Sequence, residues 1–293
     1  MNNFLKIKNL FFIFIVFAGI APLWAGPADW SFLPASTVFK PLIGDPREPI
    51  TGIVAYLNQV NYEGQVGGTL EFIRYSPQDD IQYGWGLFAL GDILLGEDGA
   101  TFPMLDGDFY IGTYFSGSFG DFSVRLEALH ESTHLGDSYQ TTVNGTLQSS
   151  QIPLYFSNGG PVTATYTREN GNAILSFQPS EFLRVYGGAG IWDEPLINNN
   201  SDPLFASFGA EIYSPYWSID HSAMRSYLTG SLQWKGDQNV WDVEVQLGLQ
   251  WKAFKNSDRA LRIAILYYTG DSQFGQFYNV SDTHLALATF FDF

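Results

Sequence analysis

Three residues of this chain have the types and spacing that acyl transfer requires: His130, Ser132 and Glu169. On a β-strand, His130 and Ser132 point to the same side with their Cβ atoms about 7 Å apart, so the imidazole can reach the hydroxyl. A serine becomes a nucleophile beside such a base, and a carboxylate can orient the base. The spacing therefore suggests Ser132 as nucleophile, His130 as base and then acid, and Glu169 as orienting group.

Two other interpretations compete for this segment. His130, Ser132 and His134 continue the parity of an apolar strand face, so they can simply mark the place where a membrane strand emerges into water. The run from His130 to His134 also fits the zinc pattern H-E-x-x-H. Zinc needs both histidines on one helical face, whereas a strand separates them by about 13 Å. We therefore interpret the zinc pattern as accidental.

Three loop carboxylates are further candidate ligands. Asp137, Asp193 and Glu194 could bind calcium or bridge lipopolysaccharide through divalent ions. Single carboxylates on loops are usually just solvated. The sequence therefore predicts no metal and no cofactor.

The elements that would position these residues are β-strands, and residues 241–252 show the pattern best. Every second side chain from Trp241 to Trp251 is apolar, and those between are polar or glycine. The two tryptophans are ten residues apart, which is about 33 Å along an extended strand and about 25 Å of height once the strand tilts. That height, with aromatic ends, is typical of a strand in a membrane-spanning barrel.

The same signal repeats along the chain and predicts an all-β fold: a closed antiparallel transmembrane barrel of about 12 strands, with short periplasmic turns and longer outer loops. The strands are expected near residues 50–58, 66–76, 82–92, 107–117, 121–133, 163–178, 181–191, 204–214, 224–235, 239–254, 260–270 and 283–293. Residues 26–49 are rich in proline, so we expect a periplasmic arm or partial plug there rather than strands. Residues 50–293 would form the barrel.

Both ends of the chain indicate export to the outer membrane of a Gram-negative bacterium. Lys6 and Lys8 precede an apolar run that ends near Ala25, which is the layout of a signal peptide over residues 1–25. The last strand alternates up to Phe293, and this resembles the signal by which the barrel assembly machinery recognises its substrates.

The charged residues limit both the partners that we expect for the chain and the width that we expect for the lumen. The net charge of −16 excludes nucleic acid as an expected partner, because phosphate binding needs clustered Lys and Arg. No cysteine is present, so no disulfide can form. Strand parity turns a mixed set of charges inward, where they should pair and narrow the lumen, which disfavours a wide porin. These residues are Arg125, Glu127, Arg184, Glu211, Asp242, Glu244, Lys252 and Arg262.

Two stretches, 125–137 and 267–278, resemble the bacterial domain-of-unknown-function family 1207, and residues 45–49 and 184–188 are weaker echoes. The family's run carries two serines between the histidines, whereas this chain has Thr133 at the second. The resemblance covers most of the mature chain and implies an outer-membrane barrel without an assigned activity.

Two functional hypotheses follow. The first is an outer-membrane barrel of unassigned activity with a narrow charged lumen, whose loop 134–162 meets partners and whose wall contacts lipid and lipopolysaccharide. The alternative is a serine acyl hydrolase of outer-leaflet lipid, because His-x-Ser on an outer barrel face resembles lipid A 3-O-deacylase and outer-membrane phospholipase A.

Overall fold

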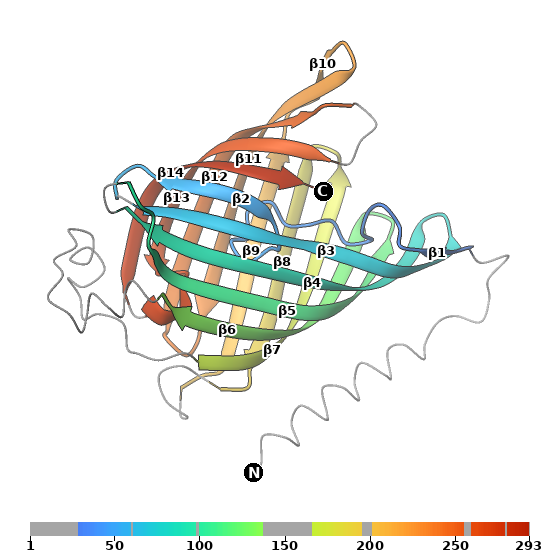
Figure 1. Cartoon of the computed structure of the whole chain (residues 1–293). Helices are drawn as coiled ribbons and strands as arrows, with labels where there is room; N and C mark the ends of the chain where they lie inside the picture. The colour runs from blue at the N-terminus through green and yellow to red at the C-terminus, as the bar shows by residue number, and fades with distance from the viewer. Residues whose placement is uncertain are drawn as a thin grey trace, which may run out of the picture.

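The computed structural model describes residues 29–59, 61–97, 100–136, 166–194, 201–254, 259–278 and 280–292 (Figure 1). The expected signal peptide, Asp137, most of the loop 134–162 and Phe293 lie outside these ranges. Among the described residues, no helix is long and apolar enough to cross a lipid bilayer.

The chain forms a closed barrel of 12 antiparallel strands, as the alternation predicts. Neighbours along the barrel wall follow one another in the sequence, and pairing of β3 with β4 completes the circle. The barrel strands are β2 (Thr51–Tyr56), β3 (Asn61–Gln78), β4 (Ile81–Gly96), β5 (Met104–Phe119), β6 (Phe122–Leu135), β7 (Tyr166–Ser180), β8 (Leu183–Trp192), β9 (Leu204–Tyr213), β11 (Ser222–Lys235), β12 (Val240–Lys252), β13 (Ala260–Asp271) and β14 (Ser281–Asp292). We call the end that carries residues 136–166 and 272–280 the loop end, and the opposite end the turn end.

Two short strands lie outside the barrel circle and were not expected from the sequence. β10 (Trp217–Ile219) pairs with β11, and Figure 1 shows it projecting beyond the rim. β1 (Asp29–Phe32) corrects the prediction that residues 26–49 contain no strand. The cause lies in β3, which β2 covers only at Tyr62–Gln65. β1 pairs with Ile73–Ser76 and satisfies part of the remaining edge of β3.

The outer surface of the barrel is apolar and aromatic. Trp241 and Trp251 both face outward at opposite ends of β12, with 52% and 43% of their surface exposed. Leu247 lies between them and is 58% exposed. A wall of exposed Leu, Ile and Val between two aromatic levels is the surface that lipid covers on a membrane barrel.

A charge placed at the middle of this wall should therefore destabilise the barrel in lipid. We expect Leu247→Arg to lower the free energy of unfolding by about 2–4 kcal/mol, and Thr269→Arg, nearer the loop end, by about 0–1 kcal/mol. Thr269 pairs with Val243, whereas Leu247 pairs with Ile265 at the middle of the wall. Urea unfolding in phospholipid vesicles measures both. Equal effects of the two substitutions would contradict a lipid-facing wall.

Candidate functional site

The predicted catalytic residues lie on the outer wall near the loop end of β6 and β7. The register pairs His130 directly with Glu169. His130 Nδ1 lies 2.7 Å from Glu169 Oε1, and the two side chains are 42% and 47% exposed. The carboxylate is therefore placed to orient the imidazole or to form an ion pair with its protonated form.

Ser132 pairs with a different histidine. Its Oγ lies 2.6 Å from Nε2 of His134, the residue two positions further along β6. The three predicted residues therefore do not form one group. Glu169 pairs with His130, whereas Ser132 pairs with a fourth residue, His134. Because His134 is the nearer base, the serine chemistry available here differs from the order His130 to Ser132 that the spacing suggests. The alternation of side chains along a strand does not decide between His130 and His134, because both point to the same side as Ser132.

The neighbourhood of these pairs is partly apolar. The ring of Phe109 meets the ring of His134 edge-on, with centroids 6.0 Å apart. Asp193, which the sequence offers only as a loop carboxylate, accepts a hydrogen bond of 2.8 Å from the backbone nitrogen of Glu169. Asp193 therefore fixes the end of β7 rather than standing alone in solvent. β6 is a strand throughout, so His130 and His134 share no helical face for zinc.

A second group of functional interest fills the lumen. Residues 34–50, which we call the plug, run through the barrel between β1 and β2 without regular secondary structure. Glu48 of the plug accepts two hydrogen bonds from the Arg125 guanidinium, at 2.8 and 2.7 Å. Arg125 Nε also lies 2.7 Å from Glu127 Oε1. All three groups are buried, so this ion-pair cluster ties the plug to β6.

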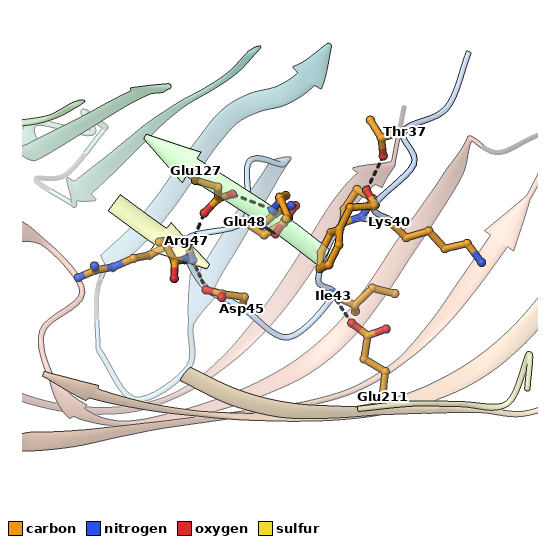
Figure 2. A network of polar contacts seen from close by, with 12 residues as sticks. Thr37, Lys40, Ile43, Asp45, Arg47, Glu48, Glu127 and Glu211 are labelled. Carbon is orange, nitrogen blue, oxygen red and sulfur yellow. Dashed lines mark hydrogen bonds and ion pairs between the residues drawn. The ribbon is translucent and has the colours of Figure 1, made fainter. Parts of the chain in front are cut away.

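The wall also binds the plug through its backbone. Arg184 donates to the carbonyl oxygens of Pro41 and Lys40, each at 2.8 Å. On the neighbouring strand β9, Glu211 Oε1 accepts a hydrogen bond of 2.8 Å from the backbone nitrogen of Ile43, a contact visible in Figure 2. Phe39 lies between two guanidinium groups, those of Arg125 and Arg184, at 4.7 and 5.0 Å from the ring centre. Polar contacts thus hold the plug against β6, β8 and β9, which lie close together in the barrel wall.

A second segment lies against lumen-facing residues at the loop end. We call residues 272–280 the cap; they include the short 3-10 helix η1 (Gly275–Phe277). The backbone nitrogen of Gly275 donates to Asp108 Oδ2 at 2.8 Å, and the Gln276 side chain donates to the Thr133 hydroxyl at 3.2 Å. Phe274 and Phe277 are almost completely buried. The cap therefore packs into the barrel rather than standing above it.

The stretches that resemble a known family meet inside the barrel. Arg125, in the stretch 125–137, binds Glu48, in the stretch 45–49. Thr133, also in the stretch 125–137, accepts a hydrogen bond from Gln276, in the stretch 267–278. The stretch 184–188 contributes Arg184, which donates to the Pro41 carbonyl oxygen of the plug. No local pattern in the sequence indicates a role for Glu48 or Gln276, although both lie in stretches that resemble the family.

This geometry defines a class of protein: a barrel whose own plug and cap occupy its lumen. The chain belongs to the family described as "Protein of unknown function (DUF1207)", which matches residues 27–293 and confirms the resemblance seen in the sequence. A comparison with curated proteins gives no match.

Two solved structures are similar to this chain, both with low sequence identity and a low TM-score. One is the crystal structure of the beta domain of the Bordetella autotransporter BrkA, at 10% identity and a TM-score of 0.46, covering 83% of this chain and 96% of that one. The other is LpxR from Salmonella typhimurium, at 10% identity and a TM-score of 0.40, covering 79% and 88%. Likenesses of this degree carry no information about what this chain binds or does.

Proposed function

We propose that this protein is an outer-membrane barrel that is closed to diffusing solutes and acts through its rim and wall. The observation that carries this proposal is the filled lumen: the plug binds β6, β8 and β9 through buried Arg125, Arg184 and Glu211. The apolar wall supports the membrane as its site, and outer-leaflet lipid and lipopolysaccharide as what surrounds it. The barrel assembly machinery is the proposed partner during insertion, through the strand that ends at Phe293.

A pore needs a continuous water path, and the plug occupies part of the lumen that such a path would use. The enclosed cavity beside the plug has a volume of about 20 Å³, which is room for about one water molecule. Lumen-facing side chains of opposite charge pair with near neighbours on the same strand or on adjacent strands. The charged character predicted for the lumen agrees with these contacts.

Conductance tests the proposal. The purified protein in a planar lipid bilayer should give no single-channel steps in 1 M KCl, whereas a general porin inserted in the same bilayer gives large ones. Steady open-channel steps from the wild-type chain would reject a closed resting barrel.

A second candidate function is hydrolysis of an outer-leaflet lipid ester, and the Ser132–His134 contact is the observation that favours it. In such a reaction His134 would take the Ser132 proton as the hydroxyl attacks the ester carbonyl. It would return that proton to the leaving alkoxide, and water would then release the fatty acid from Ser132. The Glu169–His130 pair would lie beside the reacting group as an electrostatic partner.

Acyl release from lipid A or phospholipid tests this candidate. We expect Ser132→Ala and His134→Ala to abolish release to similar extents, because nucleophile and base act as a unit. Glu169→Ala should lower it less. Ser123→Ala, on the same strand away from the pairs, is the matched control. Absence of release from wild type, or unchanged release from Ser132→Ala, would eliminate the hydrolase and leave the closed barrel.

A further inference from the structure

Two basic side chains lie together at the turn-end rim, on the lumen side of β11 and β12. Arg225 pairs with Gln250 and Ala223 pairs with Lys252, so Arg225 and Lys252 are diagonal neighbours on one face of the sheet. Such neighbours are about 7–8 Å apart, a distance that long side chains span. Both cations contact the same ring: the Arg225 Cζ lies 4.6 Å, and the Lys252 Nζ 5.5 Å, from the centre of Tyr216.

Neither cation of this rim pair has an acidic partner. Across the part of the chain that the structure describes, no carboxylate oxygen lies within 4.0 Å of the charged nitrogens of Arg225 or Lys252. The chain has 30 Asp and Glu against 14 Lys and Arg, so a basic group should readily find a carboxylate. Lumen cations such as Arg125, Arg184 and Arg262 do so. The charge of the rim pair is therefore available to an external anion.

The Arg225 guanidinium is fixed in place while its terminal nitrogens remain unbound. Its Nε donates to Gln250 Oε1 at 2.7 Å, and its Cζ lies 3.8 Å from the centre of the Tyr213 ring. The Tyr216 hydroxyl donates to the same Gln250 oxygen at 3.2 Å and holds the second ring in position. Among the described residues, neither Nη1 nor Nη2 of Arg225 has an acceptor, and neither is shut off from solvent.

This arrangement suits an oxyanion. The planar guanidinium offers parallel N–H groups that match two oxygens of one anion, and a fork that is already held in place loses little freedom on binding. The Lys252 ammonium adds a compact second positive charge beside it.

We propose that the rim pair binds an anion that carries a phosphate monoester group. Such a group has a charge of about −1.5 to −2 at pH 7 and three acceptor oxygens. Arg225 takes two of these oxygens and Lys252 takes the third. A carboxylate would match the arginine fork but would leave the charge of Lys252 uncompensated.

The position at the rim gives this phosphate two sources. On the outer face of the same strands, Trp217, Met224 and Trp251 form one row of cross-strand neighbours. Tryptophans at this level of a membrane barrel lie among lipid headgroups. The ligand is therefore either the phosphate of a lipid headgroup or that of a dissolved phosphorylated compound. The site is separate from the plug contacts, so its failure would leave the closed barrel unaffected.

Phosphate binding to the folded barrel tests the inference. Calorimetric titration of the wild-type chain in detergent with glycerol 3-phosphate should show saturable binding. Arg225→Gln should weaken this binding at least about tenfold, because it removes the fork, and Lys252→Met should weaken it by a smaller factor. Lys40→Met removes the same charge from an exposed lysine of the plug that donates to Gln178, and it should bind as the wild type does. A band shift on heating reports which variants have folded.

Lipid nanodiscs distinguish the two sources. In nanodiscs of phosphatidylcholine the wild-type chain should bind glycerol 3-phosphate as it does in detergent. If added phosphatidic acid abolishes that binding, the lipid headgroup is the ligand; if binding persists, the ligand is a dissolved compound. Both results support the site.

Chemical protection on the wild-type chain decides the matter if the variants do not fold. Phenylglyoxal should label Arg225, and glycerol 3-phosphate should suppress this label, as mapped by mass spectrometry of peptides. Absence of phosphate binding by folded wild type, or equal binding by folded Arg225→Gln, would overturn the inference. Labelling of Arg225 that phosphate leaves unchanged would overturn it as well.

Discussion

Replacing residues 36–48 with a Gly-Ser linker of equal length should turn a silent barrel into an ion-conducting one. These residues supply the side chains and carbonyl groups that occupy the lumen, whereas β1 and β2 on either side stay paired with β3. A Gly-Ser linker lacks the Glu48 carboxylate that binds Arg125 and the Phe39 ring that lies by two guanidinium groups. Because the linker is flexible, its backbone is not held against Arg184 and Glu211, and this leaves room for water. Single-channel recording should show discrete steps that the wild-type chain lacks.

The current through the opened barrel should prefer cations. Buried carboxylates of Asp92, Asp106 and Asp108 line the loop end of the lumen, and rings of acidic side chains favour cation passage. A matched control replaces residues 214–221, which lie at the rim outside the lumen, with the same type of linker and should remain silent. Silence of the plug-replaced variant would contradict the plug as the principal seal and would assign that role to the cap.

Arg125→Leu should cost about 3–5 kcal/mol of stability, the second large effect that we expect. The Arg125 side chain is only 7% exposed, and its guanidinium neutralises Glu48 and Glu127 together. Without it, two carboxylates remain in the lumen with no cation between them. Urea unfolding of the barrel in vesicles, followed by tryptophan fluorescence, measures the loss.

A double variant distinguishes the ion pair from simple loss of packing. Arg125→Leu with Glu48→Gln should recover part of the stability lost in the single variant, because one uncompensated charge is removed with its partner. Lys252→Met, which removes a half-buried cation 5.5 Å from the Tyr216 ring centre, should cost less than about 1 kcal/mol. Equal losses in Arg125→Leu and Lys252→Met would contradict a central role for the Arg125 cluster.

The barrel was predictable from the sequence because its strands obey a local rule. The alternation from Trp241 to Trp251 fixes which side chains face lipid, and β12 follows it residue by residue. The same parity placed Arg125, Glu211 and Arg262 inside, where they are buried. Each of the 12 expected strands has a counterpart in the barrel, with boundaries shifted by a few residues.

The contacts of the irregular segments could not be predicted in the same way. No periodicity relates Glu48 to Arg125, 77 residues away, and the path of the plug depends on packing against several strands together. β1 depends on how far β3 outruns β2, which requires the register of both strands. The pairing of Ser132 with His134 rather than His130 depends on rotamers, which strand parity leaves open.

A disulfide between the plug and the wall tests the central claim most directly. A Cβ atom on Gly44 would lie 3.2 Å from the Cβ atom of Thr229 on β11, close to the separation that a disulfide needs. The chain has no cysteine of its own, so Gly44→Cys with Thr229→Cys gives a pair without background. Oxidation of the folded barrel should join the two positions, shown by protease fragments that separate only after reduction. A folded barrel in which these cysteines stay unjoined, and both react freely with a water-soluble maleimide, would show that the lumen is open and would contradict this account.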